Sequence, residues 1–234
     1  MQYQFDWTVV ISGKYFEWLV SGLVVTIKLS VVSIVLSFLL GLVIAVMRMS
    51  HFRPVRWFAR GYLEFFRNTP LLVQIFFWYF GSYKILPDAA NEWLNTQGFE
   101  FAAAVIALTI YTSAFIAEDI RSGVRSIPKE QMEAARSSGF SYVRSMIYII
   151  LPQAVRITIP PLINQFLSLM KNSSLAMTIG VAEMMYQARQ VESYTFKGFE
   201  AFSAATLVYV VLSLIITGLM TLYDKKFLQP IKAH

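Results

Sequence analysis

Cysteine is absent from this 234-residue chain, and charged residues make up only 15% of it. Without a thiol, the chain has neither a disulfide framework nor a thiolate metal site. Soluble proteins carry about 25% charged residues, whereas 56% of the residues here are hydrophobic. The shortage of charge, together with several long apolar runs, predicts an integral membrane protein.

Signatures of catalysis are also missing. The two histidines, His51 and His234, lie far apart in the sequence, so we expect no metal site. There is no G-x-x-x-x-G-K-[ST], G-x-S-x-G or H-E-x-x-H motif. Glu118 and Asp119 are adjacent, but consecutive helix positions point about 100° apart, and Arg121 suits an ion pair with Glu118. We therefore expect neither enzymatic activity nor a cofactor in this chain.

Apolar segments of membrane length recur along one transmembrane domain that covers residues 1–234. Pro70 breaks the second segment, with Asn68 or Thr69 as the cap of the restart, and Pro160 opens the fourth. Gly22 and Gly41 each begin a small-xxx-small pair that allows close helix approach. The polar residues of 84–100 and 183–200 are expected in exposed connections. The expected spans, about five, are residues 18–47, 57–83, 101–120, 157–185 and 201–223.

Basic residues indicate the orientation. The net charge is +6, but Lys and Arg gather at the ends of apolar segments rather than on a phosphate-binding face. Regions 48–60, 121–156 and 224–234 hold 13 of the 20 basic residues, and the connections on the opposite side hold 4. The positive-inside rule then predicts an N-terminus outside and a C-terminus in the cytoplasm.

Two short helices are expected in residues 125–156, between the third and fourth spans. Ser126 suits the N-cap of the first helix and Pro128 its first turn, and Gly139 can end it in a left-handed conformation. Ser141 would cap the second helix, which Pro152 would close. Because the first helix is rich in charged residues, the pair is expected at the membrane surface, where a soluble protein can grip it.

The stretch 125–156 resembles part of a known protein family. Glu133-Ala134-Ala135, then Gly139 and Leu151-Pro152, match the EAA loop of ABC importer permeases. The runs AEDIRSG (117–123), FRNTPLLVQIFFWYF (66–80) and KNSSLAMTIGVAEMMYQA (171–188) resemble the polar amino-acid branch, and most of all glutamate/aspartate permeases. The resemblance covers about residues 22–223. Glu130 and Ser138 depart from the pattern, which usually has Gly and Leu there.

The resemblance implies a type I ABC importer permease fold with a cytoplasmic coupling loop at about 125–156. It implies a bacterial cytoplasmic (inner) membrane location and a separate ATPase dimer that binds ATP and Mg²⁺. It also implies a second, different permease chain and an extracytoplasmic solute-binding protein, with no nucleic acid partner. The residues expected to contact the ATPase are Glu133, Ala134, Ala135 and Gly139.

Lys171 is a charge within the fourth span, about 20 Å along a helix that starts near Ile157. Such a charge is costly and marks a functional site or an internal ion pair. Arg67 has a possible local partner in Glu64, and Gln74 also suits a helix–helix contact. The candidate substrate path comprises Lys171, Asn172, Ser173, Arg67, Asn68, Thr69 and Gln74.

The charges of these candidate residues predict the class of substrate. Two cations and the neutral Asn172 favour an acidic amino acid, glutamate or aspartate, because a carboxylate at position 172 would repel an anionic side chain. Glutamine or a basic amino acid is the alternative substrate. A self-sufficient channel or secondary transporter is the alternative class, although such a protein would have little use for an EAA loop.

Overall fold

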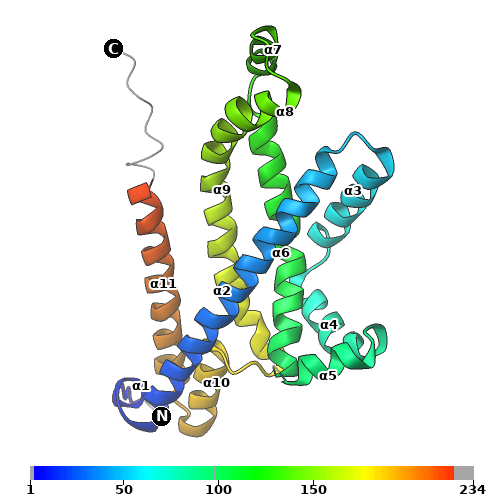
Figure 1. Cartoon of the computed structure of the whole chain (residues 1–234). Coiled ribbons are helices and arrows are strands. Elements are labelled where there is room, and N and C mark those ends of the chain that lie inside the picture. Colours follow the sequence, from blue (N-terminus) through cyan, green and yellow to red (C-terminus); the bar gives the residue numbers. More distant parts are fainter. Residues whose placement is uncertain (1–2, 97, 224–234) are drawn as a thin grey trace. The chain divides into compact units, whose positions relative to one another are not determined.

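The computed structural model describes residues 3–96 and 98–223. These residues form helices joined by short turns, without any strand (Figure 1). Four helical segments are long and apolar enough to cross a membrane, which confirms the expected all-α membrane fold. The four are Gly13–Met49, Phe99–Arg125, Tyr142–Ile179 and Gly198–Leu222, and a shorter apolar helix is Leu71–Ser82.

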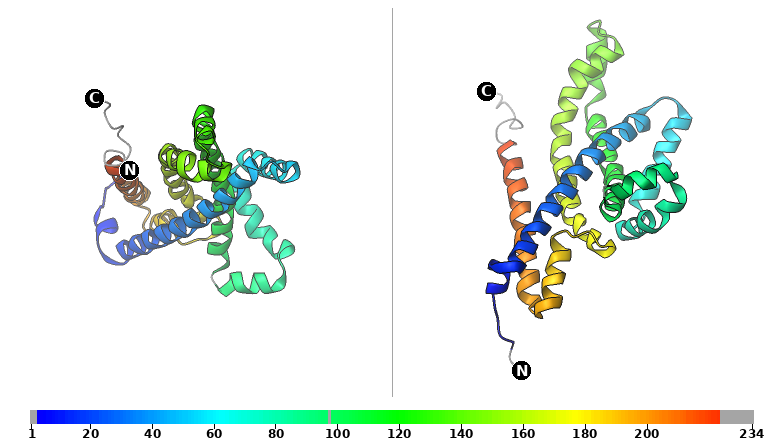
Figure 2. Two further views of the ribbon diagram at one scale, coloured as in Figure 1. Left: turned by 45° about the horizontal axis from the view of Figure 1, so that its top comes forward. Right: turned by 60° about the horizontal axis from the view of Figure 1, so that its bottom comes forward.

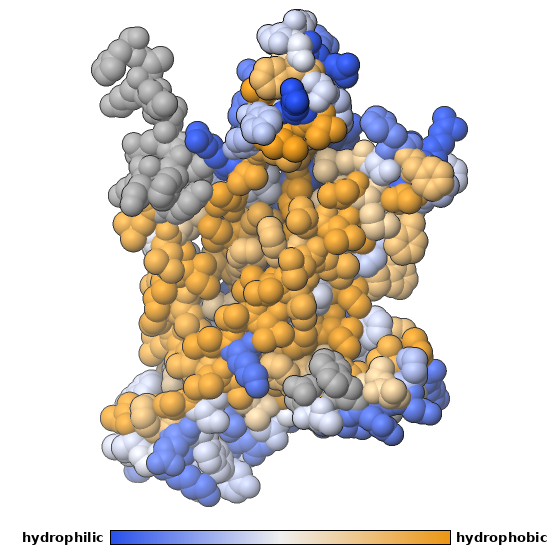
Figure 3. Space-filling model, viewed as in Figure 1, coloured by the Kyte–Doolittle hydropathy of each residue, from blue (hydrophilic) through white to orange (hydrophobic). Residues whose placement is uncertain are grey.

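The elements are named in chain order. They are α1 (Thr8–Ile11), α2 (Gly13–Met49), α3 (Arg53–Arg67), α4 (Leu71–Ile85), α5 (Asp88–Thr96), α6 (Phe99–Arg125), α7 (Lys129–Ser137), α8 (Tyr142–Ser145), the π-helical turn η1 (Met146–Ile150), α9 (Leu151–Asn172), the 3₁₀ segment η2 (Ser173–Ile179), α10 (Met184–Thr195) and α11 (Gly198–Tyr223). On the face drawn in Figure 3, apolar side chains cover the membrane-length helices, and hydrophilic ones gather at helix ends.

The chain forms two compact units, which are described separately. Unit 1 is built from the described residues within Met1–Val35, Thr69–Thr109 and Leu167–Thr217, and unit 2 from those within Leu36–Asn68, Ile110–Phe166 and Gly218–His234. Residues 224–234, which were expected on the cytoplasmic side, lie outside the described residues.

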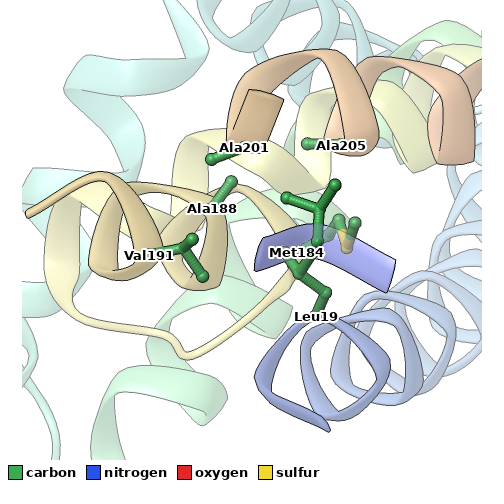
Figure 4. Close-up of a cluster of buried hydrophobic side chains, with 7 residues drawn as sticks. Leu19, Met184, Ala188, Val191, Ala201 and Ala205 are labelled. Atoms are coloured by element: carbon green, nitrogen blue, oxygen red, sulfur yellow. The ribbon is translucent and has the colours of Figure 1, made fainter. Parts of the chain in front are cut away.

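The core of unit 1 joins the first half of α2 to α10 and α11 (Figure 4). Leu19 of α2 is buried with Met184 and Ala188 of α10 and with Ala205 of α11. A Cβ atom at Gly22 would lie 2.9 Å from Met184 Cα, so the glycine is what permits this close contact. The predicted close approach at Gly22 is confirmed.

The core of unit 2 joins the second half of α2 to α3 and α6. A Cβ atom at Gly41 would lie 2.6 Å from Ile116 Cγ2, which confirms the predicted close approach at this glycine as well. Tyr62 of α3 donates a hydrogen bond of 2.9 Å to the carbonyl oxygen of Ile110 in α6. The buried apolar side chains here are Ile44, Ala45, Ala59, Leu63, Ala114 and Ala117.

The second expected span, 57–83, is two helices in the structure. The break at Pro70 is confirmed, but Pro70 itself occupies the N-cap position of α4, in place of Asn68 or Thr69. The Asn68 amide donates to the Glu64 carbonyl oxygen at 2.6 Å and so ends α3. The Gln74 amide donates to Thr69 Oγ1 at 2.7 Å, which links α4 back to the break.

The fourth expected span begins earlier and ends sooner than predicted. Pro152 does not close a helix, because the helical path runs from Tyr142 through η1 and α9 to Ile179. Pro160 and Pro161 lie inside α9 rather than at its start. The π-helical turn before Pro152 accommodates the missing N–H, and Gln153 donates its amide to the Ile149 carbonyl at 2.7 Å.

Two predictions about connections were wrong. Residues 84–100 contain a helix, α5, rather than only a loop. The segment 183–200 was expected to be exposed, yet Glu183 and Glu200 at its ends are fully buried. Buried carboxylates need hydrogen-bond donors, and both have them, with Tyr3 donating to Glu200 and several donors around Glu183.

Candidate functional site

The first candidate site is the pair α7 and α8, which projects beyond α6 and α9 in every view (Figures 1 and 2). Pro128, with φ −56° and ψ 141°, takes the N-cap position of α7. The prediction that Ser126 caps this helix was wrong, because the Ser126 hydroxyl donates to the Gly123 carbonyl at 2.8 Å and so closes α6. The short element thus begins one turn after a membrane-length helix ends.

The turn between α7 and α8 has the predicted geometry. Gly139 has φ +87°, the left-handed conformation, and a Cβ there would meet nothing within 4 Å. The N–H groups of Gly139 and Phe140 donate to the carbonyls of Arg136 and Ala135, at 3.0 and 3.1 Å. Ser141 then caps α8 by accepting a hydrogen bond of 3.3 Å from Arg144 N–H. Both capping predictions at this turn are confirmed.

The EAA residues lie on different faces of α7. Glu133 and Ala134 are exposed, whereas Ala135 is buried. Below them, Ile127, Ile150 and Ala154 form a buried apolar cluster, against which Met132 packs. Ala135 thus faces the apolar interior, while Glu133 and Ala134 of α7 are accessible at the surface.

Helices α6 and α9 are in direct contact at the foot of this pair. A Cβ atom at Gly123 would lie 2.0 Å from Thr158 Oγ1 and 3.3 Å from the Ala154 carbonyl oxygen. Thr158 Oγ1 in turn donates to that carbonyl at 2.7 Å. We call the segment from Ser122 to Thr158 the knob. The end of α6 and the start of α9 are therefore in contact at the base of α7 and α8.

The second candidate site lies in unit 1, where the fourth span is interrupted. Helix α9 ends at Asn172, and the tighter η2 follows it. Lys171 is exposed at this change of helix type and lines a groove of about 330 Å³. The other lining residues all belong to α11, and four of them carry a hydroxyl group. They are Thr206, Tyr209, Val210, Ser213, Leu214 and Thr217.

Glu183 stands behind this groove and holds three elements together. Its carboxylate caps α10 by accepting from Met185 N–H at 3.0 Å and Tyr186 N–H at 2.8 Å. Tyr209 of α11 donates to it at 2.7 Å, and Thr26 of α2 lies at 3.5 Å. Because Tyr209 also lines the Lys171 groove, Glu183 fixes the position of one groove wall.

The remaining candidate residues are divided between the two units. Asn172 is half-buried, and Ser173 is fully buried with its hydroxyl donating to the Met170 carbonyl at 2.7 Å. Thr69 and Gln74 lie at the start of α4, which packs against η2 in unit 1. Arg67 and Asn68 belong to unit 2.

Arg67 does not form the expected ion pair with Glu64 in the described part of the chain. Its guanidinium lies over the Phe115 ring, 5.4 Å from the centroid. Glu118 and Arg121 do form the expected helix-end ion pair, with Arg121 Nε donating at 2.9 Å. Sequence reasoning missed Glu183 and Tyr209 as partners. An acidic residue directly before a helix was a usable capping signal, but a tyrosine in an apolar span gave none.

The structure thus has an exposed knob, and a membrane helix that changes helix type beside a groove lined by Lys171 and α11. A family model described as "Binding-protein-dependent transport system inner membrane component" matches residues 37–229. The chain belongs to this family. It is therefore a permease component of such a system, and the predicted resemblance to ABC importer permeases of the polar amino-acid branch is confirmed.

Two curated relatives cover most of the permease. The probable glutamine ABC transporter permease protein GlnM of Bacillus subtilis (strain 168) is 48% identical over 199 residues, which is 85% of this chain and 88% of the relative. The glutamate/aspartate import permease protein GltJ of Escherichia coli (strain K12) is 33% identical over 220 residues, 92% of this chain and 89% of the relative.

Solved structures support the same fold. A crystal structure of an amino acid ABC transporter with histidines contains a chain that is 34% identical, with a TM-score of 0.85 over 96% of the permease and 100% of that chain. The MetNI methionine ABC transporter in an inward-facing conformation contains a chain that matches with a TM-score of 0.68. At 18% identity, over 88% of the permease and 94% of that chain, the second match shows the fold alone.

Proposed function

We propose that this chain is the membrane-spanning permease subunit of an ATP-driven importer of glutamate and aspartate. The observation that carries the substrate assignment is the groove beside the helix break. Among the described residues, its lining has one cation, Lys171, four side chains with a hydroxyl group, and no carboxylate. An acidic amino acid has two carboxylates and one ammonium group, so it needs more positive than negative partners. The Lys171 ammonium group meets that need.

The helix break at Pro70 is a second feature that favours an anionic substrate. Helix α4 starts at Leu71, directly after Pro70, and its first N–H groups carry a partial positive charge. Helix α4 packs against η2, the segment that follows Lys171. Broken helices of this kind bind anionic groups in other transporters.

Glutamine is the second candidate substrate. The specific observation in its favour is the 48% identity to a probable glutamine permease, compared with 33% to a glutamate/aspartate permease. Glutamine and glutamate differ by the charge of one group, so Lys171 decides between them. A basic amino acid fits less well, because the groove offers its side chain no anion.

The proposed partners follow from the knob and the family. The exposed Glu133 and Ala134 of α7 would contact a cytoplasmic ATPase dimer, which holds ATP and Mg²⁺, and Gly139 would shape that surface. A second permease chain and an extracytoplasmic solute-binding protein complete the complex. The apolar side chains of Val211, Leu214 and Leu219 on α11 are exposed. They would pack against the second permease chain or against lipid.

The proposed orientation places the knob in the cytoplasm and the N-terminus outside, as the distribution of Lys and Arg indicates. We expect a reporter that is active only outside the cytoplasm to work when it is fused near Glu92 or Tyr194. The same reporter should be inactive when it is fused near Arg56 or Glu133. Activity in the opposite pattern would refute this orientation and the cytoplasmic position of the knob.

Gly139→Val tests the coupling role in the reconstituted complex of the permease with its ATPase and binding protein. Space is not the obstacle, because a Cβ at this position meets nothing within 4 Å. The obstacle is φ +87°, which costs a β-branched residue about 1–3 kcal/mol and so shifts the turn. We expect transport and substrate-stimulated ATP hydrolysis to fall together, about tenfold, while the permease remains in the membrane.

Gly139→Asn is the matched control, because asparagine adopts the left-handed conformation at much lower cost. It should keep most of the transport and of the stimulated hydrolysis. The wild-type permease without the ATPase should show no concentrative uptake. Full activity in Gly139→Val, or equal losses in both variants, would rule out the role given to the backbone of this turn.

A further inference from the structure

A second pocket, separate from the Lys171 groove and from the face of α7, lies entirely within unit 2. It has a volume of about 290 Å³ and collects four arginines from the end of α2, the first turns of α3 and the end of α6. Met49 completes the lining. The four arginines are Arg48, Arg56, Arg121 and Arg125.

The charges in this pocket are not balanced by the described residues around it. Arg121 is paired with Glu118, but none of the other three arginines forms an ion pair within residues 3–96 and 98–223. Among the described residues, Arg121, Arg60 and Arg125 repel Arg48, and Glu118 attracts it. Four guanidinium groups around a small volume, with one carboxylate nearby, disfavour each other unless an anion joins them.

Arg48 provides a second, independent observation. Its Nε atom is buried and has no hydrogen-bond partner among residues 3–96 and 98–223. A buried N–H group without a partner is costly, so its presence points to a group that accepts it in the assembled protein. The acceptor must be anionic or strongly polar, because the neighbouring pocket wall is made of guanidinium groups.

The surroundings indicate where this anion comes from. The pocket lies where the membrane-length helices α2 and α6 end, and the ends of such helices are expected at the level of lipid headgroups. Next to Arg56, the side chains of Trp57 and Phe58 on α3 are 72% and 64% exposed, and Val46 is exposed one turn before Met49 on α2. A helix with arginines on one side and exposed aromatic residues beside them is typical of the membrane interface.

We propose that this pocket binds the phosphate of an anionic phospholipid in the leaflet on the knob side. Guanidinium groups bind phosphate oxygens through paired hydrogen bonds, and Arg48, Arg56 and Arg125 supply such groups at the pocket. The acyl chains then lie along the exposed apolar surface of α2 and α3. The bound lipid bridges α2, α3 and α6 at the foot of the knob, a role that depends neither on the transported substrate nor on the ATPase contact.

Native mass spectrometry of the full-length permease, extracted from nanodiscs, tests this proposal. We expect a phosphatidylglycerol molecule to stay bound where phosphatidylcholine does not. Arg56→Gln with Arg125→Gln should weaken phosphatidylglycerol retention by about tenfold or more, since each basic group contributes several-fold to the binding of anionic lipid. Arg53→Gln with Arg156→Gln removes the same charge from exposed positions outside the pocket and should leave retention unchanged.

Three results would overturn the proposal. Equal retention of the two lipids would show that the pocket does not select a lipid phosphate by charge. Displacement of the lipid by millimolar inorganic phosphate would show a site for a free anion rather than for a lipid. Loss of ATPase association in Arg56→Gln with Arg125→Gln, without any loss of lipid, would assign these arginines to the protein partner.

Discussion

Glu183→Ala is expected to lower the melting temperature of the detergent-solubilised permease by about 10 °C. The substitution leaves the N–H groups of Met185 and Tyr186 and the Tyr209 hydroxyl without their acceptor in a fully buried site. Each buried donor without a partner costs about 1–3 kcal/mol, and the set costs about 3–5 kcal/mol. For a chain of this size, 1 kcal/mol corresponds to about 2–4 °C.

Glu17→Ala is the control for this measurement, because Glu17 is an exposed carboxylate on α2 in the same unit. It should change the melting temperature by no more than about 2 °C. Adding Tyr209→Phe to Glu183→Ala should recover part of the loss, since one unpaired donor disappears. If Glu183→Ala melts like Glu17→Ala, the carboxylate does not hold α2, α10 and α11 together.

Lys171→Met is expected to reduce glutamate uptake by about 10- to 100-fold in proteoliposomes that contain the complete importer. Methionine keeps the length and apolar character of the side chain but removes the charge at the groove. The loss of one charge-assisted hydrogen bond of about 1.5–3 kcal/mol accounts for that factor. Glutamine, whose side chain is neutral, should lose less. Assembly with the ATPase should be intact, because Lys171 and the knob belong to different units.

Lys28→Met serves as the control, because Lys28 is an exposed lysine within the α2 span. Its ammonium group lies 5.3 Å from the centre of the Phe101 ring and does not line the groove. Uptake by this variant should stay within about twofold of wild type. Wild-type glutamate uptake by an assembled Lys171→Met importer would reduce Lys171 to a structural charge. In that case the solute-binding protein, rather than the permease, would select the substrate.

Local signals in the sequence were enough to predict several features. Apolar length located the membrane helices, Pro70 located the break in the second segment, and Gly139 with Ser141 located the turn of the knob. Each of these features depends on a few neighbouring residues, either through hydrophobic length or through the backbone preference of one residue type. That is why the sequence alone sufficed for them.

Features that depend on distant contacts were not predictable in the same way. Pro152 and Pro160 were taken as helix boundaries, yet a π-helical turn and the Gln153 side chain let the helical path continue. Glu183 was expected in an exposed segment because it is acidic. Its burial depends on Tyr209, 26 residues further on, whose hydroxyl supplies the hydrogen bond that makes the buried carboxylate acceptable.

The contact between Gly123 and Thr158 has a consequence for protein engineering. Because α6 and α9 touch there, and the apolar cluster of Ile127, Ile150 and Ala154 lies just above, the knob has no flexible stem at which it can be cut. A chimera that exchanges only α7 and α8 with those of another permease would place foreign helices on an apolar base shaped for the native ones. The exchangeable module is the whole stretch from Ser122 to Thr158, transplanted with both of its supporting helix ends.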